Sequence, residues 1–164
     1  MATRTEPVDY IERTREQYAA LGYPTYHWVT NAGPPPWTPL VKPVAESRVA
    51  LIASGGIYAR GQVAFHYRDD TSLRVIAGGT PQSELRVTHF AYDLADARRD
   101  PSVVFPLETL RRLADDGTIG GLGRNAYTFM GGIYSSRKVT ELVAPAIAER
   151  LARDEVDLAL FVPV

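Results

Sequence analysis

Cysteine is absent from all 164 residues. Its absence excludes disulfide bonds, thiolate metal ligands and a thiol nucleophile within these residues. An excess of positive charge is also missing, because the formal net charge is -1 at pH 7. A chain of this charge offers no electrostatic basis for nucleic acid or an anionic membrane as its main partner.

Long hydrophobic runs are missing too. The opening MATRTEPVDY lacks the apolar stretch of a signal peptide, and no segment approaches the roughly 18 apolar residues of a membrane helix. We therefore expect a cytoplasmic protein that binds neither membrane nor nucleic acid. What is present is an ordinary globular composition, with 45% hydrophobic and 23% charged residues, in a length that suits one domain.

Two apolar runs indicate a parallel sheet. Residues 48–54 (RVALIAS) and 156–163 (VDLALFVP) are continuous rather than alternating, which is typical of strands buried on both faces. Helices are expected over 106–117 (PLETLRRLADDG) and 139–153, the second kinked or split by Pro145. Shorter strands are expected at 73–76, 85–89 and 127–130. The pattern predicts a single α/β domain over 1–164, with a mostly parallel central sheet flanked by helices in a three-layer arrangement of Rossmann or flavodoxin type.

The first 43 residues form a different region. Residues 8–21 predict an amphipathic helix that ends at Gly22. Residues 31–43 (NAGPPPWTPLVKP) carry too many prolines for a helix or strand, because each proline lacks a backbone donor and fixes φ. We expect an N-terminal helix followed by a proline-rich arm.

Ligands of α/β sheets bind outside the carboxyl ends of the strands. The strand at 48–54 ends in Ser54-Gly55-Gly56, with Tyr58 just beyond, and Met130 ends the strand at 127–130. These five residues are the predicted substrate-binding groups: Ser54, Gly55, Gly56, Tyr58 and Met130.

The stretch VTHFAYDLAD supplies the predicted catalytic residues, His89 and Asp93. A histidine and a nearby carboxylate can form an acid/base pair, or can bind a divalent metal if His66 or Asp69 converges on them. A purely structural interpretation is also open. In it, His89 orients the loop that follows, and Asp93 or Asp96 caps a turn.

Several segments together resemble the selenoprotein B family of glycine, sarcosine, betaine and D-proline reductases. The most specific are Thr88-His89 to Asp93, DPSVVFPLETLRRL at 100–113 and YTFMGG at 127–132, and the likeness extends over 37–58 and 144–164. The resemblance implies an oxidoreductase of amino-acid metabolism in which a selenocysteine or cysteine attacks the C–N bond of an activated amine. It also implies a small amine or amino-acid substrate, a homo-oligomer or a hetero-complex, no cofactor in this chain, and a pyruvoyl group on a partner subunit.

In that family the catalytic selenocysteine or cysteine follows a tripeptide such as Val162-Pro163-Val164. Here the sequence stops at Val164. A UGA selenocysteine codon read as a stop, a noncatalytic relative and a deliberately shortened chain all explain this departure. The resemblance places the site where Val164, the Gly55 bend and His89 share one cleft, with a protonated His89 delivering the proton that a departing amine requires.

Two alternatives stay open. The first is a noncatalytic, oligomeric or partner-binding subunit that uses the helix at 8–21 and the arm at 33–43 as contacts. The second is a metal-dependent hydrolase or lyase built on His89 and nearby carboxylates, whereas the reductase interpretation includes no metal.

Overall fold

The computed structural model describes residues 8–25 and 27–164. The chain groups into two compact units, whose boundary lies between Trp37 and Thr38, inside the proline-rich arm. The α/β fold lies in the second unit. No helix of the described residues is both long and apolar enough to cross a membrane.

The N-terminal unit contains the predicted helix, α1 (Tyr10–Ala20). The Asp9 carboxylate caps its start by accepting hydrogen bonds from the backbone of Ile11 and Glu12, both at 3.1 Å. Gly22, in the left-handed region at φ 71°, follows its end. No residue of α1 is buried. The apolar face predicted for this helix is therefore not buried in a hydrophobic core of the N-terminal unit.

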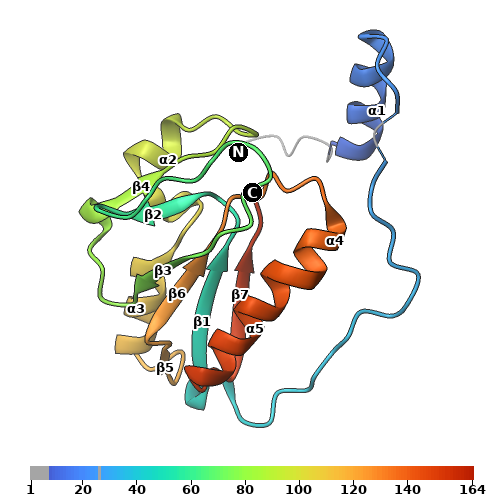
Figure 1. The fold of residues 1–164 in the computed structure, drawn as a ribbon. Helices are drawn as coiled ribbons and strands as arrows, with labels where there is room; N and C mark the ends of the chain where they lie inside the picture. The colour runs from blue at the N-terminus through green and yellow to red at the C-terminus, as the bar shows by residue number, and fades with distance from the viewer. Residues whose placement is uncertain (1–7, 26) are drawn as a thin grey trace, which may run out of the picture. The chain divides into compact units, whose positions relative to one another are not determined.

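The sheet of the second unit is mixed but mostly parallel, as predicted (Figure 1). Its central strand, β1 (Arg48–Ala53), pairs in parallel with three others, and the antiparallel β3 lies at one edge. The strands around β1 are β3 (Arg74–Ala77), β5 (Gly121–Leu122), β6 (Asn125–Thr128) and β7 (Leu158–Val162). A separate antiparallel pair is formed by β2 (Ile57–Ala59) and β4 (Leu85–Val87).

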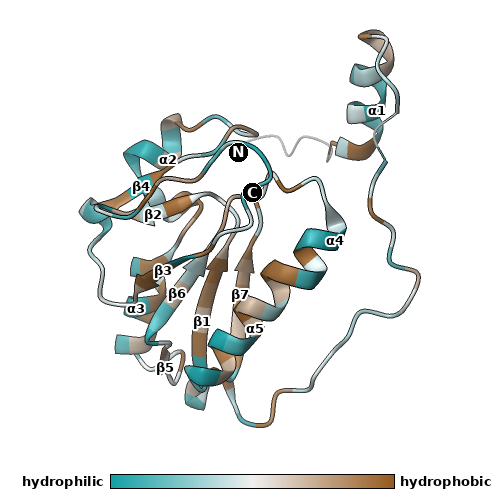
Figure 2. Ribbon diagram, in the orientation of Figure 1, coloured by the Kyte–Doolittle hydropathy of each residue, from teal (hydrophilic) through white to brown (hydrophobic). Residues whose placement is uncertain are grey.

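Helices cover both faces of the sheet, which makes the predicted three layers (Figure 1). The helical segments are α2 (Ala95–Arg99), α3 (Leu107–Asp115), α4 (Ser136–Lys138), the π-helical η4 (Val139–Val143) and α5 (Ala144–Arg153), with 3-10 turns η1 (Val44–Glu46), η2 (Gln82–Glu84) and η3 (Pro101–Val103). On one face, Leu51 of β1 belongs to a core that includes Phe105 and Leu107. On the other, Ile52 and Tyr127 share a core with residues of η4 and α5. Figure 2 shows β1 as largely hydrophobic.

Pro145 splits the second long helix, as its missing N–H predicts. It lies in the first turn of α5, where that N–H has no intrahelical partner. The turn before it, η4, is π-helical. A wider π turn accommodates the interrupted hydrogen-bond ladder.

The two apolar runs differ in burial. Every residue of β1 after Arg48 is buried, as predicted. The prediction is wrong for β7, in which Leu160 is 39% and Phe161 61% exposed. The physical reason is position, because β7 pairs with β1 and with no second strand among the described residues.

Candidate functional site

The turn after β1 is built on close backbone contacts. The Gly56 amide donates to the Phe129 carbonyl, and the Thr88 amide donates to the Gly56 carbonyl, both at 3.0 Å. Gly56 has φ 70°, and a Cβ there would lie 1.9 Å from the Thr88 oxygen. Only glycine fits this position. The turn therefore joins the carboxyl ends of β1 and β6 to the segment that carries His89.

Val164 lies at this same turn. Its backbone N–H donates to Ser54 Oγ at 2.9 Å, and the Ser54 amide donates to the Val162 carbonyl at 3.2 Å. Val164 Cγ2 lies 3.3 Å from the position that a Cβ would take at Gly55. The structure thus brings the Val-Pro-Val segment against the Ser54-Gly55 bend, as the sequence analysis expected.

His89 lies beside Gly56 of the same bend and is buried, with 8% of its surface exposed. Its Cβ is 3.6 Å from the Cβ position at Gly56. The Tyr92 ring packs against the imidazole with ring centroids 4.8 Å apart. The Tyr92 hydroxyl donates to the Gly55 carbonyl at 2.8 Å. Tyr92 thereby fixes the imidazole relative to the bend.

The imidazole of His89 is set up as a neutral donor. Burial lowers the pKa of His89 below its usual 6.5, against a weaker, opposing interaction with the Ser54 backbone. The Ala91 amide donates to Nδ1 at 3.0 Å, which assigns the proton of the neutral ring to Nε2. Nε2 is buried and has no hydrogen-bond partner. An unpaired buried N–H is costly. Because the Ser54 backbone acts on the ring and Nε2 is shielded from solvent, an acceptor from a substrate would reach Nε2 only if the bend moved.

Asp93 does not join His89. Its side chain is exposed, and its carboxylate accepts a hydrogen bond from the Ala95 amide at the start of α2, at 2.9 Å. No hydrogen bond connects the two predicted catalytic residues in the described chain. The contacts of both, His89 to the loop at Ala91 and Asp93 to a helical turn, are those of the structural interpretation.

The two remaining predicted residues lie differently. Tyr58 is half-buried on β2, opposite Arg86 of β4. Met130 is fully buried, bridges to Gly55 and accepts a hydrogen bond from the Gly132 amide on Sδ at 3.2 Å. Met130 therefore packs at the bend without exposure to solvent, and contact with a substrate would require this loop to move.

The metal alternative finds no supporting geometry. Within residues 8–25 and 27–164, no three His, Asp or Glu side chains gather as ligands of a metal ion. His66 is exposed and accepts from the Arg68 amide at 3.2 Å. The Asp69 carboxylate accepts from the Tyr134 amide at 2.9 Å.

Sequence reasoning missed two side chains of this region. Tyr92 lies only three residues beyond His89, but its bond to the Gly55 carbonyl requires the fold to be known. Thr128 of β6 pairs in register with Ala53 at the end of β1, and its hydroxyl is buried without a partner, like His89 Nε2. In the sequence, the one feature that could have pointed to Thr128 was its place at the end of a strand.

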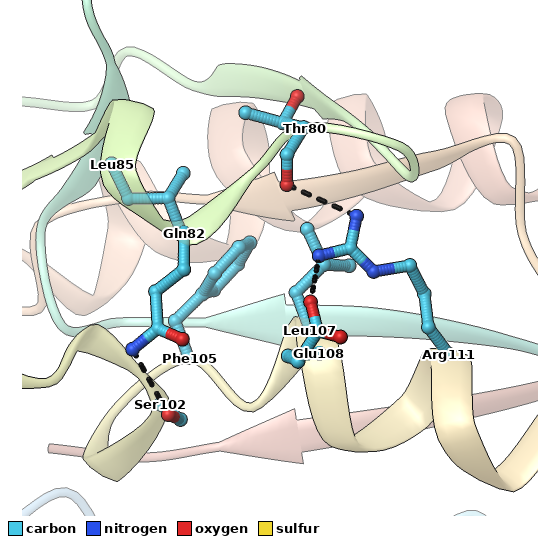
Figure 3. A pocket seen from close by; sticks show the side chains of 8 residues that line it. All are labelled: Thr80, Gln82, Leu85, Ser102, Phe105, Leu107, Glu108 and Arg111. Carbon is cyan, nitrogen blue, oxygen red and sulfur yellow. Dashed lines mark hydrogen bonds and ion pairs between the residues drawn. The ribbon is translucent and has the colours of Figure 1, made fainter.

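A depression elsewhere on the unit is structural. Figure 3 shows it lined by Thr80, Gln82, Leu85, Ser102, Phe105, Leu107, Glu108 and Arg111. Arg111 pairs with Glu108 and donates to the Thr80 carbonyl at 3.2 Å. Gln82 donates to Ser102 Oγ at 3.4 Å. These partners tie the loop after β3 to α3 and η3, which explains the polar lining without a ligand.

Comparison with known proteins places this geometry in a family. The model of the glycine/sarcosine/betaine reductase selenoprotein B family matches residues 23–163. The chain belongs to this family. The family match covers the whole α/β unit except Val164, and it leaves out α1.

Two curated relatives of the family are reductase subunits. The D-proline reductase subunit gamma of Acetoanaerobium sticklandii is 35% identical over 133 residues, which are 81% of this chain and 55% of that protein. The glycine reductase complex component B subunit gamma of Symbiobacterium thermophilum is 29% identical over 136 residues, which are 76% of this chain and 30% of that protein. The chain thus spans about half the length of the first and under a third of the second. No solved structure matches the chain at a significant level.

Proposed function

We propose that this chain is part of an amino-acid reductase complex that cleaves the C–N bond of a small amine or amino acid. The observation that carries the proposal is the meeting of Val164, the Ser54-Gly55-Gly56 bend and His89 at the carboxyl edge of the sheet. A residue attached to the Val164 carbonyl would begin beside Ser54 and Gly55. The family's selenol or thiol would then enter the site where α/β sheets bind ligands.

The reaction replaces one C–N bond by a C–H and an N–H bond, and so consumes two electrons and two protons. None of these 164 residues provides the thiol or selenol. The lowered pKa of His89 favours hydrogen-bond donation from Nε2, for example to a substrate carboxylate, over the proton delivery predicted from the sequence. The pyruvoyl group that the family implies would belong to a partner subunit, and no residue here is assigned to it.

The test is an assay of the complex as it exists in cells. A tag at the N-terminus of this chain allows the complex to be purified from the source cells. Incubation with D-proline, glycine, sarcosine or betaine and a dithiol reductant should give the ring-opened amino acid from D-proline, or ammonia or an amine from the acyclic substrates. A purified complex that consumes none of them contradicts the proposal.

A second candidate, a partner-binding subunit, is favoured by one observation. The helix α1 has no buried residue, although Val8 and Leu21 beside it are apolar and 68% and 66% exposed. Exposed apolar side chains at both ends of the helix suit a contact with another polypeptide. Light scattering after size exclusion tests this: a monomer that catalyses the reaction alone excludes it.

A further inference from the structure

The strand β7 has one edge that is unpaired among the described residues. It runs parallel to β1 along its whole length, from Leu158 beside Val49 to Val162 beside Ala53. The Val162 carbonyl accepts from the Ser54 amide and so faces β1. Because backbone groups of alternate residues point to the same side of a strand, Ala159 and Phe161 direct their N–H and C=O groups away from β1.

This outer edge is apolar as well as unpaired. The strand reads LALFV, without a charge or a proline. Leu160 is 39% exposed and Phe161 61% exposed. Natural sheets protect their edges with charge, proline, bulges or a covering segment, because an open edge is a template for another strand. None of these devices occurs within β7.

The opposite edge of the sheet is protected in this way. At β3, the Gln62 side chain donates to the Val75 carbonyl at 2.9 Å and so occupies an outward backbone group. Arg74 of the same strand donates to the Val63 carbonyl at 2.7 Å and stacks over Phe65. The sheet is thus closed at β3 and open at β7.

We propose that the outer edge of β7 binds a further parallel β-strand from polypeptide that corresponds to the part of the gamma subunits not spanned by this chain. Those relatives are longer than this chain. The stretch that matches it makes up 55% of one relative and 30% of the other. Parallel strands come with crossover helices that cover both faces of the sheet. Such a unit would cover Leu160 on one face and Phe161 on the other.

The occupant is identified by photo-cross-linking. Phe161 is replaced by benzoylphenylalanine, which keeps the aromatic ring, and the tagged complex is irradiated and purified from the source cells. We expect a cross-linked peptide homologous to the unmatched part of the gamma subunits. A cross-link to β7 of a second copy or to an unrelated protein overturns the proposal, as does no cross-link. The same probe at Val75, on the closed edge, is the control.

Matched proline variants test the backbone pairing itself. Phe161→Pro removes an outward N–H and leaves the bonds to β1 in place. Val75→Pro makes the same change at β3, where the backbone also points outward. We expect Phe161→Pro to weaken the association about tenfold and Val75→Pro to leave it unchanged. Equal association of both variants contradicts the pairing.

Amide hydrogen exchange covers the case in which a variant fails to fold. In the wild-type complex, the Ala159 and Phe161 amides should exchange more slowly than in the isolated chain, whereas equal exchange contradicts the proposal. The edge pairing rests on the proposed function in one respect, because it takes the sheet with the added strand to be the active form of a reductase. An inactive complex with the expected cross-link would refute the function alone, and an active complex without it would refute the edge pairing alone.

Discussion

At the scale of single residues, His89 couples folding stability to pH. Its pKa is below 6.5 in the folded chain because the ring is buried, whereas the unfolded chain binds a proton near pH 6.5. The stability contributed by the neutral ring is present above pH 6.5 and is lost as the pH falls through the folded pKa.

We therefore expect the free energy of unfolding to decrease between pH 7.5 and pH 5.5, and to decrease less in His89→Asn. Urea unfolding at both values measures this. His27 and His66 are present in both proteins and serve as the internal control. Identical pH dependence in the two proteins would show that His89 is not the buried neutral group described here.

Tyr127 gives a second prediction at this scale. Its hydroxyl donates to Asp154 Oδ2 at 2.7 Å, and Asn125 donates to the same oxygen at 3.0 Å. Burial and the Asp154 carboxylate raise the pKa of Tyr127 to about 12. Burial acts to raise the pKa of Asp154, but the hydrogen bonds from Tyr127 and Asn125, together with the Arg124 charge, outweigh it and lower that pKa.

We expect Tyr127→Phe to reduce the free energy of unfolding at pH 7 by about 1 kcal/mol, since a half-exposed carboxylate loses one donor. Wild-type stability should also fall between pH 10 and pH 12, where the folded tyrosine keeps its proton and the unfolded one loses it. That alkaline loss should be smaller in Tyr127→Phe. Tyr134→Phe, at a side chain 69% exposed, is the control and should leave both measurements unchanged.

The residues of the site were predictable from the sequence to different degrees. Ser54, Gly55 and Gly56 follow from a buried strand that ends in glycines, because strand ends are where such sheets bind ligands. The separate contacts of His89 and Asp93 were not predictable, since four residues along a loop do not determine where two side chains point. The Val164 bond to Ser54 joins residues 110 apart and depends on the register of β7 against β1.

At the scale of secondary structure, the turn after β1 depends on one glycine. Gly56→Ala would place a methyl group 1.9 Å from the Thr88 oxygen at φ 70°. The Thr88 carbonyl and the Gly56 turn are both parts of the backbone. Neither can rotate away from the added methyl group, as a side chain could. We expect a loss of about 3 kcal/mol or more in stability, or failure to fold.

Gly61→Ala is the matched control. Gly61 also has a positive φ, 88°, but nothing lies within 4 Å of its Cβ position. The backbone cost alone should be about 1 kcal/mol. If thermal unfolding shows equal losses for the two variants, the close approach at Gly56 is not what holds the bend.

Long, strongly patterned elements were predictable and short ones were not. The apolar run of β1 and the leucine spacing of α3 are local signals, and both elements form where predicted. The strand β5 has two residues and β2 has three, which is too short for a periodic pattern to show. The exposure of β7 depends on which strands lie beside it in the sheet, and the residues of β7 alone do not show which strands those are.

At the scale of the whole molecule, the chain is organised around one carboxyl edge and one open sheet edge. The first brings together the candidate site, and the second is where we propose that further polypeptide is added. The family membership rests on residues 23–163, so α1 is a feature of this chain outside the shared region. The contacts divide the chain between Trp37 and Thr38, and the single domain over 1–164 stays a prediction.

The central claim is that His89 acts at this edge on an amino-acid substrate of a reductase. The direct measurement is the rate of reductive C–N cleavage by the tagged complex from source cells that carry His89→Ala as their only copy of this chain, with His27→Ala as the matched control in the N-terminal unit. The account predicts a rate at least about a hundredfold below wild type for His89→Ala, with assembly intact, and an unchanged rate for His27→Ala. A fully active His89→Ala complex would contradict it.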